Sequence, residues 1–322
     1  MSRPLIGLAL GGGGARGWAH IGVMRTLGRA GIVPDIICGT SVGALVGGVH
    51  LAGKLDALEA WARSLHRLRI MSYLDFRVSG GMIGGQRLRA VMREHLGAVS
   101  IEELPAPFTC VATDLVTGHE VWLNRGDLVD MLRASFSLPG LFSPVQVEGR
   151  WLVDGALVNP LPVSVCRAMG AHVVIAVNLN ADPIGRVRVP GQSIPRAAGF
   201  DLLKEMPAAA PSGLNHGIGS WLRRIFGREA DSPSVFGVMV QSLNILLDRI
   251  TRSRLAGEPP DVSITPRLGH IGLLEFDRAD EVITEGAAAA ERAVDELGEA
   301  IAIFSYANSR TAIAGSGSGK AR

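Results

Sequence analysis

The chain has few cysteines, and their spacing argues against a metal site. Its 322 residues include only Cys38, Cys110 and Cys166, which stand in apolar surroundings without a CxxC pair. Structural zinc sites need closely spaced cysteine or histidine ligands, and this pattern offers none. The three cysteines are therefore predicted to be small buried hydrophobic residues in a reducing compartment.

The chain also lacks a large excess of charge and long apolar runs. Its formal net charge is +2 and no basic stripe is interleaved with aromatic residues, so nucleic acid is not expected as a partner. No window offers about 18 unbroken apolar residues, the minimum for a membrane span. The first apolar run, residues 5–10, is too short for a signal peptide. The protein is therefore expected in the cytoplasm.

What the chain does have is an alternation of strand and helix signals, with 47% hydrophobic residues to build a large core. The run 173–177 is apolar on both faces, as a buried parallel strand should be. The pattern predicts an α/β fold with a mostly parallel central sheet. The other predicted strands are 5–10, 36–38, 108–113, 119–123, 146–147, 151–153 and 262–264, and the predicted helices are 18–30, 42–52, 162–169, 235–255 and 278–303.

Prolines interrupt this pattern between residues 182 and 234, which are predicted to form an insertion or lid. Residues 5–181 are expected to form the core, residues 235–305 to complete the same domain, and residues 306–322 to form a disordered tail. Within the insertion, Trp221–Arg228 combines bulky apolar and cationic side chains at helical spacing. Two interpretations stay open, a lid helix docked on the domain or a peripheral contact with the inner membrane face.

A GxSxG pentapeptide, residues 39–43, lies between a predicted strand and a predicted helix. A serine at such a turn has a strained backbone that pushes its hydroxyl clear of the sheet, while Gly39 and Gly43 let strand and helix approach closely. Unpaired N–H groups at the helix start favour a negative charge beside Ser41. Ser41 is therefore a candidate nucleophile.

A second glycine motif lies between the first predicted strand and the first predicted helix. Gly12, Gly14 and Gly17 satisfy GxGxxG, and Asp35 follows at about the distance at which a dinucleotide fold places its ribose acid. However, that acid belongs at the carboxyl end of a strand, whereas Asp35 precedes the strand 36–38. The motif also lacks the Lys-Ser or Lys-Thr pair of a P-loop.

A bare glycine loop at a helix start is rich in N–H donors that can approach a ligand closely. We therefore predict an oxyanion hole formed by the N–H groups of Gly12, Gly13 and Gly14, with Val42 as a further donor. Arg16 is expected to fix the loop by reaching carbonyls or a carboxylate. A turn that only permits close packing is the alternative.

A base for the serine is offered by Asp154, which follows the predicted strand 151–153 and precedes Gly155 and Ala156. Asp154 thus lies where a strand ends, at the sheet edge where Ser41 is also expected. The alternatives are a simple Asp-Gly turn or a histidine base after the acid in chain order. The candidate histidines are His172, which opens a buried strand, His216, in the insertion, and His270, in a loop.

The three motifs, in this order, resemble the patatin-like phospholipase family. Residues 134–145 are similar to the segment between the family's nucleophile and acid, and residues 159–162 to its continuation after the acid. Residues 81–96 and 269–277 are similar to the bacterial and neuropathy-target-esterase-like branch. The resemblance spans residues 5–297 and implies a three-layer α/β/α sandwich with a Ser-Asp dyad and no catalytic histidine.

The resemblance implies that Ser41 attacks an acyl-ester lipid after Asp154 takes its proton, and that water later releases the acyl-enzyme. No metal and no cofactor is expected. Two alternatives stay open: a dinucleotide- or phosphate-binding protein that uses the glycine loop, and a catalytically silent regulatory module of the same fold. The acyl chain and the oligomeric state are also left open.

Overall fold

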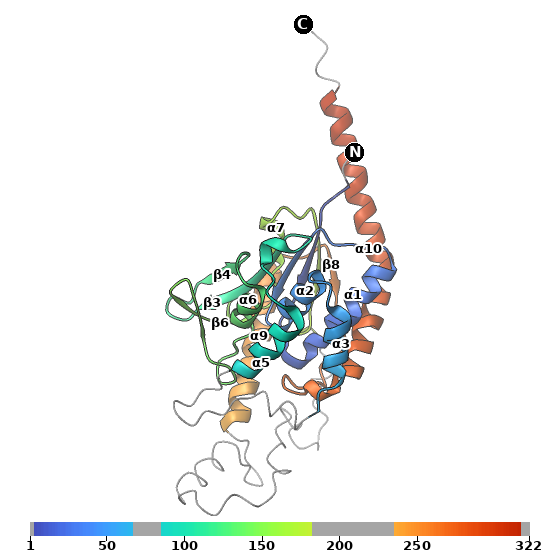
Figure 1. The fold of residues 1–322 in the computed structure, drawn as a ribbon. Helices are drawn as coiled ribbons and strands as arrows, with labels where there is room; N and C mark the ends of the chain where they lie inside the picture. Colours follow the sequence, from blue (N-terminus) through green and yellow to red (C-terminus); the bar gives the residue numbers. More distant parts are fainter. Residues whose placement is uncertain (1–2, 67–84, 182–234, 317–322) are drawn as a thin grey trace, which may run out of the picture.

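A single sheet forms the centre of the computed structural model, which describes residues 3–66, 85–181 and 235–316 (Figure 1). The strand order is β5-β6-β3-β2-β1-β7-β8, with β4 paired to β3. The strands are β1 (Ile6–Leu10), β2 (Ile36–Thr40), β3 (Phe108–Asp114), β4 (Glu120–Leu123), β5 (Val145–Val147), β6 (Arg150–Asp154), β7 (Val173–Val177) and β8 (Val262–Ile264).

The direction of the strands follows from how they are connected. β1, β2, β3, β7 and β8 pair in parallel, as strands joined by long crossovers do. β4 and β6 pair antiparallel with β3, and β5 pairs antiparallel with β6. The predicted α/β fold with a mostly parallel central sheet is thereby confirmed.

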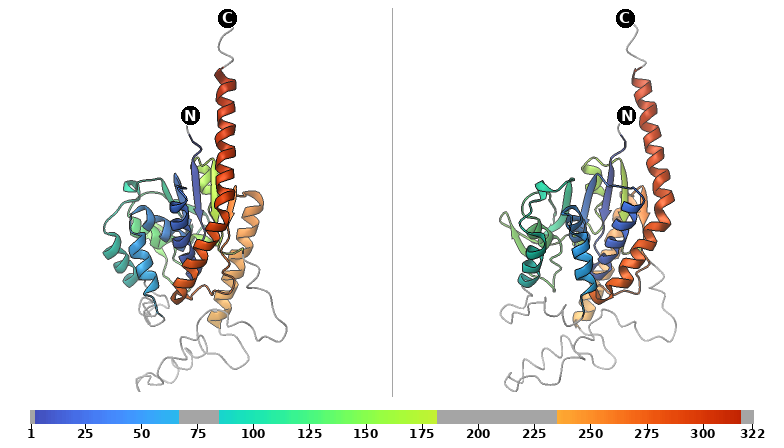
Figure 2. Two further views of the ribbon diagram at one scale, coloured as in Figure 1. Left: turned by 90° about the vertical axis from the view of Figure 1, so that its right-hand side faces the viewer. Right: turned by 45° about the vertical axis from the view of Figure 1, so that its right-hand side comes forward.

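Side chains alternate between two cores on the two faces of the sheet. Leu8 and Ile37 belong to one core, whereas their neighbours Ala9 and Cys38 belong to the other. The first core is covered by α1 (Ala19–Arg29), α2 (Val42–Leu51), α3 (Leu55–Arg63), α5 (Gln86–Leu96), α6 (Leu128–Ser135) and α10 (Ala279–Ser316). The second is covered by α7 (Val163–Ala168) and the end of α9 (Val235–Gly257), giving a three-layer α/β/α sandwich (Figure 2).

Two helices differ from the sequence prediction. The helix predicted over 18–30 begins as a 3-10 turn, Gly14–Trp18, before α1. The last helix continues to Ser316 instead of ending at 303, so the tail predicted from 306 is helical over its first part. Since residues 299–314 contain neither glycine nor proline, extending a helix that is already formed costs little. Figure 1 shows this end of α10 projecting beyond the sheet.

Some sequence predictions fall outside the described residues. The 182–234 insertion, Trp221–Arg228 and His216 are among them. Within the described residues, no helix is both long enough and apolar enough to cross a membrane. All three cysteines are buried without a disulfide, as predicted.

Candidate active site

Ser41 and Asp154 are placed by two strands that meet end to end on one edge of β3. Residues 110–111 of β3 pair with both β2 and β4, and residues 112–113 pair with both β4 and β6. A strand has two edges, so β2 and β6 share the edge opposite β4. β2 ends at Thr40 and β6, running the other way, ends at Asp154, opposite adjacent residues of β3. Ser41, which follows β2, therefore lies beside Asp154, the last residue of β6.

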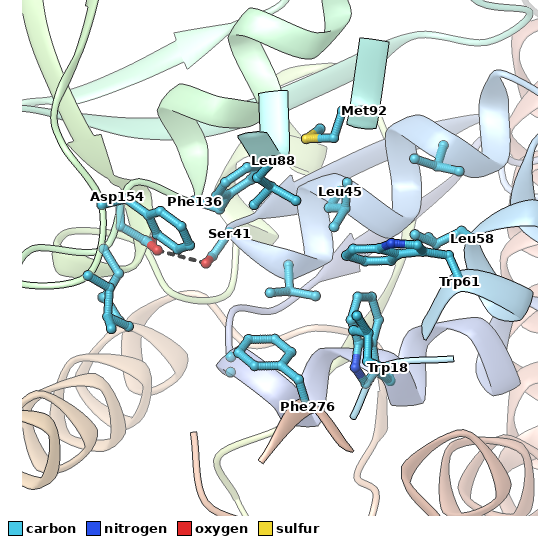
Figure 3. Close-up of a pocket in the computed structure, with 18 of the residues that line it drawn as sticks. Trp18, Ser41, Leu45, Leu58, Trp61, Leu88, Met92, Phe136, Asp154 and Phe276 are labelled. Carbon is cyan, nitrogen blue, oxygen red and sulfur yellow. Dashed lines mark hydrogen bonds between the residues drawn. The ribbon is translucent and has the colours of Figure 1, made fainter. Parts of the chain in front are cut away.

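The two side chains form a direct hydrogen bond (Figure 3). Ser41 Oγ donates to Asp154 Oδ2 at 2.7 Å, and the Ala156 N–H donates to Asp154 Oδ1 at 2.8 Å. Burial raises the pKa of Asp154 to about 6, although both hydrogen bonds favour the charged form. A carboxylate with this pKa remains mostly ionised near neutral pH and is a stronger proton acceptor than an exposed aspartate.

The turn at Ser41 has the strained backbone expected of a nucleophile between a strand and a helix. Ser41 has a φ of 56°, a region that non-glycine residues rarely adopt. A Cβ on Gly43 would lie 2.3 Å from the Leu10 carbonyl oxygen, and one on Gly39 would lie 2.4 Å from Ala44 Cα. The glycines at these positions are therefore required by the close crossing of strand and helix.

Gly155 holds Asp154 against the sheet. A Cβ on Gly155 would lie 2.1 Å from the Val111 carbonyl oxygen, so no larger residue fits without moving β3. The Ala156 side chain also lies next to the loop, since a Cβ on Gly12 would be 3.3 Å from it. The Asp-Gly-Ala element is thus packed between the sheet and the glycine loop.

The glycine loop presents two unpaired N–H groups to the site. The N–H groups of Gly13 and Gly14 have no acceptor in the described part of the chain, and both residues line the cavity beside Ser41. Val42 also lines it, and as the first residue of α2 it has no intrahelical acceptor for its N–H. The Gly12 N–H, in contrast, donates to the Pro160 carbonyl at 2.8 Å. Gly12 is therefore not available as an oxyanion donor, which corrects the prediction for that residue.

Two contacts with a distant segment hold this loop in place. Arg16 is buried, and its Nε donates to the Ile271 carbonyl at 2.8 Å. The Ala15 N–H donates to the Leu273 carbonyl at the same distance. Arg16 thus reaches a carbonyl, as the sequence suggested, and it does so from the loop to a segment 255 residues away.

Two further residues fix the loop from the side of α1 and α2. His20, which sequence reasoning missed, is fully buried and its Nε2 lies 2.7 Å from the Gly11 carbonyl oxygen. Burial lowers the pKa of His20 to about 4, so the ring is neutral and donates through Nε2. A Cβ on Gly17 would lie 2.3 Å from Val42 Cγ1, so Gly17 lets the loop pack against α2.

Ser135, also missed by sequence reasoning, fixes the nucleophile turn. Its hydroxyl accepts from the Ser41 N–H at 3.0 Å and donates to the Val111 carbonyl at 2.6 Å. The next turn supports the acid, because the Asp154 N–H donates to the Ser137 carbonyl at 3.0 Å. Both residues lie in the 134–145 segment, whose resemblance to the family was the signal available in the sequence.

We expect Ser135→Ala to lower the free energy of unfolding by about 1–3 kcal/mol, because it leaves two buried backbone groups without a partner. Urea denaturation measures the loss. Ser137→Ala is the matched control, since that hydroxyl donates only to the Arg133 carbonyl within the described structure and accepts no hydrogen bond there. An equal loss in the two variants would show that Ser135 has no special role at the turn.

An apolar cavity of about 160 Å³ opens beside the dyad. Trp18 forms part of its wall and packs edge to face against Trp61 and Phe276, with ring centroids 5.9 and 5.8 Å apart. The other walls come from α2, α3 and α5 and from residues 136–142 and 273–276. Figure 3 shows Ser41 and Asp154 on one side of the cavity and Leu58 and Trp61 on the other.

The competing site residues lie elsewhere. His172 Nδ1 accepts from the Leu5 N–H and His270 contacts Glu281 at the surface, and neither lines the cavity beside Ser41. Asp35 lies just before β2 and accepts hydrogen bonds from Arg3 and from the Ile6 N–H at the start of β1. The glycine loop, in contrast, follows the carboxyl end of β1. Because β1 and β2 are parallel, the acid and the loop lie at opposite edges of the sheet, which disagrees with a dinucleotide site.

Comparison with known proteins defines the class. Residues 8–167 match the family model described as patatin-like phospholipase. The crystal structure of VipD from Legionella pneumophila has the same fold, with a TM-score of 0.53 at 13% sequence identity over 92% of this chain and 67% of VipD.

Sequence relatives define the branch. An uncharacterized NTE family protein of Mycobacterium tuberculosis is 38% identical, over 91% of this chain and 92% of the relative. Lysophospholipase NTE1 of Mycosarcoma maydis is 37% identical over 55% of this chain, which is 10% of that much longer protein. The chain therefore belongs to the NTE family of patatin-like phospholipases.

Proposed function

We propose that the protein is a serine acyl hydrolase of lipid esters. The observation that carries the proposal is the 2.7 Å hydrogen bond from Ser41 Oγ to a buried carboxylate at the edge of an apolar cavity. Family membership supports a lipid substrate, and the match to lysophospholipase NTE1 supports ester hydrolysis. The cytoplasmic location and the membrane contact stay predictions.

The chemistry begins with a proton transfer. Asp154 Oδ2 takes the Ser41 hydroxyl proton as Oγ forms a bond to the ester carbonyl carbon. When the tetrahedral intermediate collapses, the ester C–O bond breaks and the alcohol leaves with the proton from Asp154. Water then gives a proton to Asp154 and attacks the acyl-enzyme, which releases the acid and returns the proton to Ser41.

The developing negative charge needs donors that are already in place. The N–H groups of Gly13, Gly14 and Val42 are the candidates, because all three residues line the cavity next to Ser41. One such donor is worth about 3–4 kcal/mol of transition-state stabilisation. Arg16, His20 and Gly17 act indirectly in this scheme, by holding the loop.

A fluorophosphonate probe tests the proposal, since it reacts with activated serines. We expect the wild-type protein to be labelled at Ser41, and Ser41→Ala to be neither labelled nor active on acyl esters of graded chain length. Absence of labelling, with NAD-dependent thermal stabilisation, would favour the dinucleotide-binding alternative. Absence of both would favour a catalytically silent module.

A further inference from the structure

The cavity extends much farther from Ser41 than the reaction itself requires. Along α2 it is lined by Val42, Leu45 and Val49, which lie on one face of the helix. Beyond the end of α2 it is lined by Lys54 and Ala57. The Lys54 N–H donates to the Val49 carbonyl at 3.0 Å, so the start of α3 adjoins the end of α2 that lies away from Ser41.

The opposite wall has the same apolar character. Leu88 and Met92 lie one turn apart on α5, and Leu58 and Trp61 lie on one face of α3. Figure 3 shows Leu45 between the dyad and Leu58, with Leu88 and Met92 above it. The three helices therefore enclose an elongated apolar channel that leads away from the nucleophile.

The far end of this channel reaches solvent. Lys54 and Ala57 line it there and are exposed, whereas Val49 and Leu58 just inside are buried. A closed pocket would end in buried side chains. The channel thus runs from the buried Ser41–Asp154 pair to an opening at the start of α3.

We propose that this channel binds a single straight acyl chain, whose end emerges past Ala57 when the chain is long. The proposal rests on the acyl hydrolase function above. Val49 follows Ser41 by eight residues. At a helical rise of about 1.5 Å per residue this is about 12 Å. An extended alkyl chain of about ten carbons has this length, because each C–C bond of about 1.5 Å advances the zigzag chain by less than its own length. A decanoyl chain fills the channel, and a palmitoyl chain extends through the opening at the start of α3.

Ala57→Trp tests this proposal because it places a large side chain at the opening at the start of α3, on an exposed helix position where it does not disturb the core. Ala60→Trp is the matched control, since Ala60 is exposed on the same helix but does not line the cavity. The substrates are nitrophenyl butyrate, decanoate and palmitate.

For the wild type and Ala60→Trp, we expect kcat/KM to rise from butyrate to decanoate, by up to about fourfold for each methylene buried. In Ala57→Trp, the ratio of kcat/KM for palmitate to that for butyrate should fall about tenfold or more, since a few methylenes lose their place in the channel. An unchanged ratio in Ala57→Trp would overturn the proposal.

A binding measurement separates this proposal from the proposed function. In a Ser41→Ala background, decanoic acid should raise the melting temperature, and palmitic acid should raise it less when Ala57→Trp is added. If the acids bind in this way but the wild type hydrolyses no ester, the channel stands and the hydrolase function fails. If esters are hydrolysed but Ala57→Trp changes neither binding nor the ratio, the channel assignment fails alone.

Discussion

Asp154→Asn is expected to lower kcat by about 10³- to 10⁴-fold, because an amide cannot accept the Ser41 proton. The variant should still fold, since the Asn carbonyl oxygen can accept from the Ala156 N–H in place of Asp154 Oδ1. Steady-state hydrolysis of a nitrophenyl ester measures the effect. Activity within tenfold of wild type would show that Asp154 is not the base.

The same residue sets the pH dependence. Burial raises the pKa of Asp154 to about 6, and the basic form is the carboxylate above that pH. We expect kcat/KM of the wild type to fall about tenfold for each pH unit below about 6 and to level off above it. The residual kcat/KM of Asp154→Asn should not fall in this way as the pH is lowered below about 6.

Asp154→Asn is also expected to stabilise the fold near neutral pH. A carboxyl whose pKa is raised from 3.8 to about 6 on folding stabilises the fold most when protonated, and this stability is lost as pH rises between the two values. At neutral pH the buried charge costs about 3 kcal/mol, which the amide avoids. The gain should shrink towards pH 4, and a constant difference across this range would contradict the mechanism.

A half-buried aspartate, Asp130, provides a control in which the expected change in stability has the opposite sign. The hydrogen bond from the Arg89 guanidinium lowers the pKa of Asp130, so its charged form is the one that favours folding. Asp130→Asn should therefore lower stability at neutral pH and leave kcat unchanged. The contrast separates loss of a buried charge from loss of any carboxylate.

Gly14→Ala is expected to lower kcat by about 10²- to 10³-fold, the effect of losing one oxyanion donor. Gly14 has a φ of 56°, and a Cβ there would lie 2.2 Å from the Leu273 carbonyl oxygen. The loop must therefore shift, and the Gly13 and Gly14 N–H groups shift with it. Ester hydrolysis and the rate of fluorophosphonate labelling should both report the loss.

Gly118→Ala controls for backbone strain alone. Gly118 has a φ of 70°, but nothing lies within 4 Å of the position a Cβ would take. It should lose about 1 kcal/mol of stability from the unfavourable φ and keep full activity. If Gly14→Ala retained more than about half of the wild-type kcat, the loop would not be the source of the oxyanion donors.

The sheet and the close approach of Ser41 and Asp154 were predictable because their signals are local. Each strand is a short apolar run, and the motifs around Ser41 and Asp154 lie at strand ends, where parallel topology gathers functional side chains. The helix starting at Val42 follows from the GxSxG turn for the same reason. None of these inferences required knowledge of a distant contact.

The remaining features depend on tertiary contacts. The contact from the Gly12 N–H to Pro160 and the two hydrogen bonds of Ser135 join residues far apart in sequence. Helices α3, α5 and α6 were not predicted individually, although residues of α3 and α5 line the cavity. Their apolar stripes acquire meaning only when the helices face one another across the cavity.

The carboxyl ends of β2 and β6 lie opposite adjacent residues of β3, and this arrangement also limits which insertions the sequence can accept. Successive side chains of a strand point to opposite faces, so inserting one residue within β6 would turn the carboxylate at 154 towards the core beneath α7 and α9. We therefore expect a one-residue insertion within β6 to abolish the contact between Ser41 and Asp154. The helices around the cavity can change length without affecting this count, whereas the odd or even number of residues in β6 decides whether the carboxylate at 154 faces Ser41.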